Sequence, residues 1–413
     1  MAPSATESVG YWALLRDNPR YRRLWLGLAA SMIGDWFRTM ALYHLVLQLT
    51  GASGLALGGV MIAQTVSLFV LSPVAGVAAD RFSRKWIMVG TDLVRAVLAL
   101  GFLLITSADR LWLAYVLTAV LTSVSAFFHP AYAATIPNIT TRRELVAANA
   151  LGSASWAAML AIGTALGGLV TAWLGATEAF LLDAASYVVS AGCIMGITIP
   201  AAPAAADARA TGWQAFRRGL RYMAARPYVL RLLSVKACSV GLAGGMMILI
   251  ALFAESIFEA GAIGMGTLFM ARGLGALLGP LLARRLVGEE PQMMVGTIGA
   301  AFVLTGGFYV LFGATPTLAW AALTLFMATM TSNVLWVFSS TLLQISVADA
   351  YRGRVFAADF MFFTVIMAAA TLATAWGLDY AALTPRILAA ISGSLLVLTG
   401  IFWLARPPQH ATE

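Results

Sequence analysis

The sequence is poor in charged residues and rich in apolar ones. Of its 413 residues, 11% are charged and 61% are hydrophobic, whereas soluble globular proteins have about 25% charged and about 45–50% apolar residues. A soluble domain of this composition lacks the polar side chains needed to cover its surface. The composition therefore excludes a soluble enzyme and predicts that the excess apolar residues face lipid.

Cysteine and histidine are also scarce. The two cysteines, Cys193 and Cys238, both lie in apolar segments, which excludes a disulfide framework and a CxxC metal site. The three histidines are dispersed along the chain, so a clustered active site of an integral-membrane enzyme is not predicted. No Walker A string is present, which excludes ATP as the energy source. We therefore predict no enzymatic activity and no cofactor.

Long apolar runs fill most of the chain. A spanning helix needs about 20 apolar residues, and the runs lack the alternation of a barrel, so we expect helices. The N-terminus has no apolar core before a cleavage site, so no signal peptide is predicted. The twelve predicted spans are 24–48, 55–78, 86–107, 111–134, 146–173, 177–199, 230–256, 263–284, 291–313, 317–342, 355–378 and 385–404.

The basic residues follow the predicted topology. With the N-terminus in the cytoplasm, 20 Lys and Arg residues fall in inside segments and 2 in outside loops. This asymmetry obeys the positive-inside rule and predicts an even number of spans with both termini cytoplasmic. The net charge of +8 therefore reflects membrane topology, and nucleic acid is not an expected partner.

The chain divides into two similar halves. TRRELVAAN, which begins at Thr141, resembles YRGRVFAAD, which begins at Tyr351, in the same orientation. We predict an N-terminal six-helix bundle at 1–199, a cytoplasmic linker at 200–228 and a C-terminal six-helix bundle at 229–413. The linker contains a basic amphipathic stretch expected to lie on anionic headgroups of the inner leaflet.

Several motifs resemble one family of membrane transporters. GVAADRFSRK, from Gly76 to Lys85, is similar to the G-x-x-x-D-R-x-G-R-[RK] signature of the major facilitator superfamily, with Ser83 in place of a glycine. GDW, FFHPAYAATIP and TLLQISVADAYRGRV resemble a bacterial branch of drug, macrolide and siderophore exporters, to which lysophospholipid transporters are related. The resemblance covers nearly the whole chain. It implies an all-α membrane protein with 12 transmembrane helices in two parallel six-helix pseudo-repeats, working as a monomer.

The resemblance also implies a cytoplasmic gate. Gly76 permits close helix approach, and Asp80 is expected to face the positive N-terminus of the helix near Val355, latching the halves in the outward-facing state. Basic residues of the signature would pair with Asp359 or with lipid phosphates; the alternative is that they only set topology. The predicted gate residues are Gly76, Asp80, Arg81, Arg84, Lys85, Asp92, Arg95, Arg352, Arg354 and Asp359.

GTALGGL in the fifth span resembles, in part, a glycine motif of exporters, with Thr164 in place of proline. Gly163, Gly167 and Gly168 present a small face. Small residues at this spacing allow two membrane helices to pack closely. We therefore expect a helix-packing role for these glycines.

Charges inside the spans are the candidates for mechanism, because an unpaired charge in a bilayer is costly. Asp35 and Arg38 lie near mid-span of the first helix in a D-x-x-R pattern, and Arg272 lies near mid-span of the eighth. Asp35 would either carry a proton or bind a cationic group. The alternative is a permanent ion pair of Asp35 with Arg38 or Arg272. The further predicted coupling or substrate residues are Gln64, His129 and Asn333.

These observations predict a secondary active exporter of amphipathic small molecules, such as drugs or siderophores. Protons are the expected coupling ion, and rocking of the two halves would give alternating access. Two alternatives remain open. One is a translocator of lysophospholipids, and the other is a divalent metal exporter, because GDWFRTMALYHLVLQLTG is loosely similar to the first helix of ferroportins.

Overall fold

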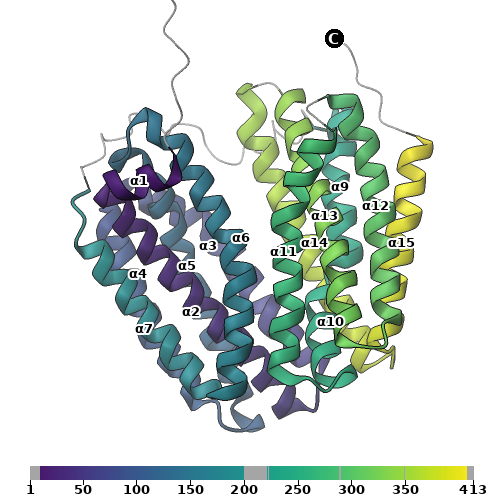
Figure 1. The fold of residues 1–413 in the computed structure, drawn as a ribbon, viewed down its shortest axis with the longest axis horizontal. Helices are drawn as coiled ribbons and strands as arrows, with labels where there is room; N and C mark the ends of the chain where they lie inside the picture. The colour runs from purple at the N-terminus through teal and green to yellow at the C-terminus, as the bar shows by residue number, and fades with distance from the viewer. Residues whose placement is uncertain (1–9, 200–220, 222, 288–289, 348, 407–413) are drawn as a thin grey trace, which may run out of the picture. The chain divides into compact units, whose positions relative to one another are not determined.

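The computed structural model describes residues 10–199, 221, 223–287, 290–347 and 349–406. Secondary structure over these residues is helical throughout. The chain forms two compact units, each a bundle of long helices (Figure 1). Unit 1 comprises residues 1–51, 59–207 and 261–266, and unit 2 comprises residues 52–58, 208–260 and 267–413. Most of the predicted cytoplasmic linker, with its amphipathic stretch, lies outside the described residues.

Eleven helices of the described part are long and apolar enough to cross a membrane. Helix α2 (Pro19–Thr50) is longer than any span requires, at 32 residues. Its mean hydropathy is lower than that of the other eleven because Asp35 and Arg38 lie in its middle. It nevertheless packs against the apolar helices α6 and α7. With α2 as the twelfth span, the predicted all-helical, multi-span membrane fold is confirmed.

Unit 1 contains three short segments and six long helices. A short helix α1 (Tyr11–Asp17) precedes α2, and two 3₁₀ turns, η1 (Phe102–Leu104) and η2 (Ala108–Arg110), connect α4 to α5. The remaining helices are α3 (Gly54–Arg81), α4 (Arg84–Gly101), α5 (Leu111–Ile139), α6 (Arg142–Trp173) and α7 (Ala176–Met195). The first residues of α3 belong to unit 2.

Local sequence explains where these helices begin. The Asn18 side chain accepts a hydrogen bond from the Tyr21 amide at 3.0 Å, and Pro19 occupies the first turn of α2, where its missing N–H costs nothing. Thr141 and Glu144 form a capping box that starts α6. Each cap satisfies amide groups that have no partner within the first turn of a helix.

An apolar core of unit 1 lies near the N-terminal end of α2. Leu14, Tyr21 and Phe128 are fully buried there with side chains from α4, α6 and α7. The Tyr21 hydroxyl donates to the carbonyl oxygen of Ala148 at 2.8 Å, so its polar end is satisfied. This core joins α1 to the bundle through Leu14.

Unit 2 contains five uninterrupted helices and one interrupted helix. The uninterrupted helices are α11 (Gly261–Val287), α12 (Pro291–Ala314), α13 (Leu318–Ser346), α14 (Asp349–Asp379) and α15 (Pro385–Ala405). The predicted span 230–256 is instead α9 (Pro227–Ala243), α10 (Met246–Leu252) and the π-helical turn η3 (Phe253–Ile257). The interruption falls at Gly244 and Gly245, where a Cβ on Gly244 would lie 2.8 Å from Ala370 Cβ of α14.

Glycines also set the contact between α12 and α15. A Cβ on Gly306 would lie 2.7 Å from the Val397 amide nitrogen, and a Cβ on Gly393 would lie 2.7 Å from the Val310 amide nitrogen. Any side chain at either position would therefore force the two backbones apart. Such close approach stabilises membrane helices through dispersion contacts, since lipid offers no hydrophobic driving force between them.

Candidate functional site

Five ionisable side chains from three helices of unit 1 gather in a mostly buried cluster. Asp35 and Arg38 come from α2, Asp92 and Arg95 from α4, and Asp183 from α7. Each D-x-x-R pair lies on one helix face, because residues three apart are neighbours on a helix. We call these five residues the charge cluster.

Arg38 links two carboxylates of the charge cluster. Its Nη2 donates to Asp35 Oδ1 at 2.9 Å, and its Nε donates to Asp183 Oδ2 at 2.9 Å. The Arg38 side chain is 5% exposed and that of Asp183 is fully buried, whereas that of Asp35 is 35% exposed. Asp35 is therefore the more accessible of the two carboxylates that Arg38 bonds.

Tyr187 of α7 connects the two D-x-x-R pairs. Its hydroxyl donates to Asp35 Oδ1 at 2.6 Å. Its ring centroid lies 4.5 Å from the Arg95 guanidinium, which also lies 4.7 Å from the Phe128 ring centroid and pairs with Asp92. Stacking of a desolvated guanidinium on an aromatic face is favourable, so Tyr187 holds both pairs in one network.

Gly34 leaves the space that Asp183 occupies. A Cβ at this position would lie 2.8 Å from Asp183 Oδ1 and 2.7 Å from Ser186 Cβ. The absence of a side chain at Gly34 thus brings α7 close enough to α2 for Asp183 to reach Arg38.

The charge cluster is not balanced. Asp35, Asp92 and Asp183 supply three carboxylates, while Arg38 and Arg95 supply two guanidinium groups. In addition, Asp92 Oδ2 and Asp183 Oδ1 are buried without a hydrogen-bond partner. A surplus negative charge is expensive in a bilayer. The arrangement is therefore suited to hold one further positive charge.

The structure adds to two sequence-based interpretations here. Tyr187 joins Asp92 and Arg95, two of the predicted gate residues, to the Asp35–Arg38 pair, and their role in a gate stays a prediction. Asp183 was not among the predicted site residues. A polar stripe at Asp183, Tyr187 and Ser190 follows helical spacing in an otherwise apolar helix, and that signal could have identified it.

The other predicted coupling or substrate residues form no hydrogen bond or ion pair with the charge cluster among the described residues. Gln64 accepts a hydrogen bond from the Tyr43 hydroxyl at 3.4 Å. His129 packs edge-on against Phe128 and lies within electrostatic range of Arg95 and Asp35. Asn333 donates to the Thr329 carbonyl of its own helix at 3.0 Å.

Arg272 lies on α11, in unit 2. Of the two ion pairs left open for Asp35, the one with Arg38 is present within unit 1.

Residues of the predicted gate make contacts within unit 1. Arg84 Nη1 donates to the Ala134 carbonyl at 2.7 Å, and Lys85 Nζ donates to the Met195 carbonyl at 2.7 Å. Arg81 is exposed. A Cβ on Gly76 would meet no described atom within 4 Å, and the close helix approach expected at this glycine stays a prediction.

The side chains of Asp80, Arg352 and Arg354 lie outside the part of the chain that the structure describes. The latch between the two halves therefore stays a prediction.

Asp359 has a partner that the sequence analysis did not assign. It forms a buried ion pair with Lys236 of α9 inside unit 2. Its Oδ2 accepts from Lys236 Nζ, and a pairing of Asp359 with basic residues of the signature stays a prediction.

The three glycines of α6 lie at close helix contacts. A Cβ on Gly163 would lie 2.8 Å from Trp36 Cδ1, and one on Gly167 would lie 2.9 Å from the Trp36 carbonyl oxygen, both on α2. Gly168 lies against Gly266 at the start of α11, in the segment that belongs to unit 1. The contacts of Gly163 and Gly167 are with the same helix, α2, that carries Asp35 and Arg38.

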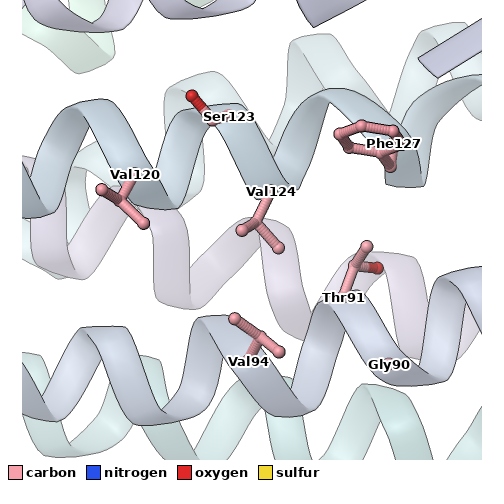
Figure 2. A pocket seen from close by; sticks show the side chains of 7 residues that line it. All are labelled: Gly90, Thr91, Val94, Val120, Ser123, Val124 and Phe127. Carbon is pink, nitrogen blue, oxygen red and sulfur yellow. The ribbon is translucent and has the colours of Figure 1, made fainter. Parts of the chain in front are cut away.

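A groove of about 360 Å³ lies between α4 and α5 (Figure 2). It is lined mainly by apolar side chains, including Val94, Val120, Val124 and Phe127. Val94 is exposed, whereas Asp92 and Arg95 on the same helix are buried. The groove is therefore on the face of α4 that points away from the charge cluster, and it supplies no charged group.

Comparison with known proteins identifies the family. The model of the transmembrane secretion effector family, MFS_3, matches residues 9–411. The chain belongs to this family of major facilitator transporters. Its helices are those of a multi-pass membrane protein, and the family to which it belongs is one of transporters.

Curated relatives agree with this assignment. The chain is 28% identical to the uncharacterised MFS-type transporter YfiS of Bacillus subtilis over 43% of the chain and 42% of YfiS. It is 26% identical to the putative bacilysin exporter BacE of the same species over 52% of the chain and 53% of BacE. The chain thus spans about half the length of these relatives. The MFS-type transporter Rv0037c of Mycobacterium tuberculosis is 26% identical over 90% of the chain and 88% of that protein.

Solved transporters share the fold. A POT family transporter in complex with 5-aminolevulinic acid has a TM-score of 0.74 at 9% identity, covering 96% of this chain and 97% of that one. An inward-facing bacterial homologue of the human lysosomal transporter Spinster has a TM-score of 0.69 at 15% identity, with 95% of each chain covered. At these identities the likeness shows the fold alone.

Proposed function

We propose that this protein is a proton-coupled exporter of amphipathic small molecules, drug-like or siderophore-like. Rocking of its two halves would give each side of the membrane access to the substrate in turn. The observation that carries the proposal is the charge imbalance of the charge cluster. Its three carboxylates outnumber its two guanidinium groups by one, so one bound proton would make the cluster neutral. In this proposal Asp35, the exposed member, takes up and releases that proton.

Protonation of the charge cluster would restore neutrality inside the membrane. Two buried guanidinium–carboxylate pairings are close to neutral, whereas a third carboxylate must be neutralised to remain in a medium of low polarity. A proton that binds in one state and leaves in the other biases the two states by its difference in affinity. A transmembrane proton gradient then drives the cycle.

The alternative of a metal exporter receives less support from the geometry. The Arg38 guanidinium lies between the carboxylates of Asp35 and Asp183, where a cation would have to bind. Among the described residues, no group of three or more His, Cys, Asp or Glu side chains is positioned to hold a metal ion.

The test compares two Asp→Asn variants in proteoliposomes loaded with a pH-sensitive dye. Asp35→Asn is expected to abolish proton movement driven by ethidium as an amphipathic probe. Asp109→Asn makes the same chemical change at an exposed residue of η2 and is expected to behave as the wild type. Full probe-driven proton movement by Asp35→Asn would refute coupling at the charge cluster.

Topology and gating complete the proposal. Both termini would lie in the cytoplasm of a bacterium, and Asp80 would latch the halves in the outward-facing state. Asp80→Asn is expected to shift the protein toward the inward-facing state, read as increased labelling of cysteines placed on the cytoplasmic side. Unchanged labelling would contradict the latch.

A further inference from the structure

Unit 2 contains a buried ion pair that the proposed proton site does not use. Lys236 of α9 and Asp359 of α14 are 4% and 6% exposed, and they pair directly. The Lys236 Nζ also lies 4.6 Å from the centroid of the Trp336 ring of α13 and 5.8 Å from that of Phe356. Three helices thus converge on one ammonium group.

Half-exposed aromatic rings adjoin this pair. The Trp336 and Phe363 rings meet edge-on at 5.0 Å, and Phe360 lies 6.2 Å from Phe363. Trp336 is 42% exposed and Phe360 is 45% exposed. We call Trp336, Phe360 and Phe363 the aromatic shelf. It offers accessible apolar area within reach of the buried charges.

The ion pair has unused hydrogen-bonding capacity. An ammonium has three donors, and Lys236 uses one of them on a described residue, Asp359. Replacing a buried ion pair by apolar side chains is often neutral or stabilising, so stability alone does not account for it. Ionisable residues within membrane spans commonly face the bundle interior or a substrate pathway rather than lipid.

The net charge of the site selects its ligand. Unlike the charge cluster of unit 1, the Lys236–Asp359 pair is neutral, so a ligand of net charge would leave an unbalanced charge in the membrane. A ligand that carries both an ammonium and an anionic group adds no net charge. Its anionic group would accept from Lys236 while its ammonium donates to Asp359.

We propose that Lys236, Asp359 and the aromatic shelf bind an amphipathic ligand with a zwitterionic head group, whose apolar body lies on the shelf. This inference rests on the proposed function in one respect: the ligand is the exported substrate. Two kinds of molecule have such a zwitterionic head group and an apolar body. One is an aromatic amino acid or a compound like it, and the other is a lysolipid with a primary ammonium.

The test measures binding to the full-length protein in detergent by isothermal titration calorimetry. The probes are L-phenylalanine, N-acetyl-L-phenylalanine, which lacks the ammonium, and L-phenylalanine amide, which lacks the carboxylate. The wild type is expected to prefer the zwitterion at least tenfold. D359N should shift the preference to the N-acetyl probe, and K236Q should shift it to the amide, because each variant leaves the opposite charge unpaired.

Trp336→Ala is expected to weaken every bound probe at least tenfold. Trp320→Ala removes an exposed tryptophan from the same helix and should have no effect. Lysophosphatidylethanolamine supplies the lipid arm: if it binds with the same dependence on Lys236 and Asp359 while the amino acid does not, the ligand source is lipid.

Two results would overturn the proposal. One is that neither zwitterionic probe binds the wild type. The other is that K236Q and D359N change the binding of all three soluble probes by the same factor. If a single variant fails to fold, the K236Q/D359N double variant, which keeps the site neutral, must lose the preference for the zwitterion. Binding needs no proton gradient, so this result is independent of the outcome for Asp35→Asn.

Discussion

Replacing Arg38 by methionine tests the charge cluster most severely. The substitution keeps an unbranched side chain but removes the group that bonds Asp35 and Asp183 at 2.9 Å each. Asp183 would then be left as a fully buried carboxylate without its partner. Removing one member of a buried ion pair costs about 3–5 kcal/mol. For a unit of about 200 residues, this corresponds to a fall in Tm of roughly 6–20 °C.

The assay is thermal unfolding of the purified protein in detergent, with two companion variants. Arg110→Met removes an exposed arginine of η2 and should change Tm little. Arg38→Met/Asp183→Asn removes the stranded charge and should recover most of the loss, because the penalty arises mainly from the unpaired carboxylate. The reasoning is refuted if Arg38→Met is as mild as Arg110→Met, or if the double variant is no more stable than Arg38→Met alone.

Three further predictions concern stability, and thermal unfolding checks each of them. Tyr187→Phe removes the 2.6 Å hydrogen bond to Asp35 and should cost about 1.5–3 kcal/mol, the range for bonds to charged groups; no loss would exclude Tyr187 as a link in the network. Gly34→Ala should cost about 1–3 kcal/mol by crowding Asp183, whereas Gly90→Ala, whose new Cβ would meet no described atom within 4 Å, should be harmless. Equal effects of the two substitutions would contradict the packing argument. Gly306→Ala should destabilise the α12–α15 contact by about 1–3 kcal/mol, whereas substitution of the adjacent residue, Gly307→Ala, should not. A larger loss for Gly307→Ala than for Gly306→Ala would contradict the assignment of Gly306 to this contact.

Apolar run length was sufficient to predict the helical fold. The interruption of the seventh span at Gly244 and Gly245 was not predictable in the same way, because it depends on how close α14 comes to these glycines. A hydropathy value is calculated from one segment alone and contains no information about the helices that pack against that segment. Hydropathy alone also fails to identify α2 as a span, because the partners of its polar middle lie on other helices.

The candidate site was predictable in part. Asp35 and Arg38 were identified because charges inside a span are rare, and their spacing places them on one helix face. Their union with Asp183 was not, since 145 residues separate Arg38 from Asp183. Likewise, Lys236 and Asp359 lie 123 residues apart, and nothing in either local segment specifies that they pair. Spacing within one helix predicts neighbours, whereas contacts between helices depend on tertiary packing.

The central claim is that the charge cluster has a surplus of one carboxylate, and counting protons tests it most directly. Proton uptake by the purified protein is measured by potentiometric titration from alkaline to mildly acidic pH, for the wild type, Asp35→Asn and Arg38→Met. Three carboxylates and two guanidinium groups predict that Asp35→Asn takes up one proton fewer than the wild type and that Arg38→Met takes up one more. Equal uptake by all three folded proteins would contradict the account.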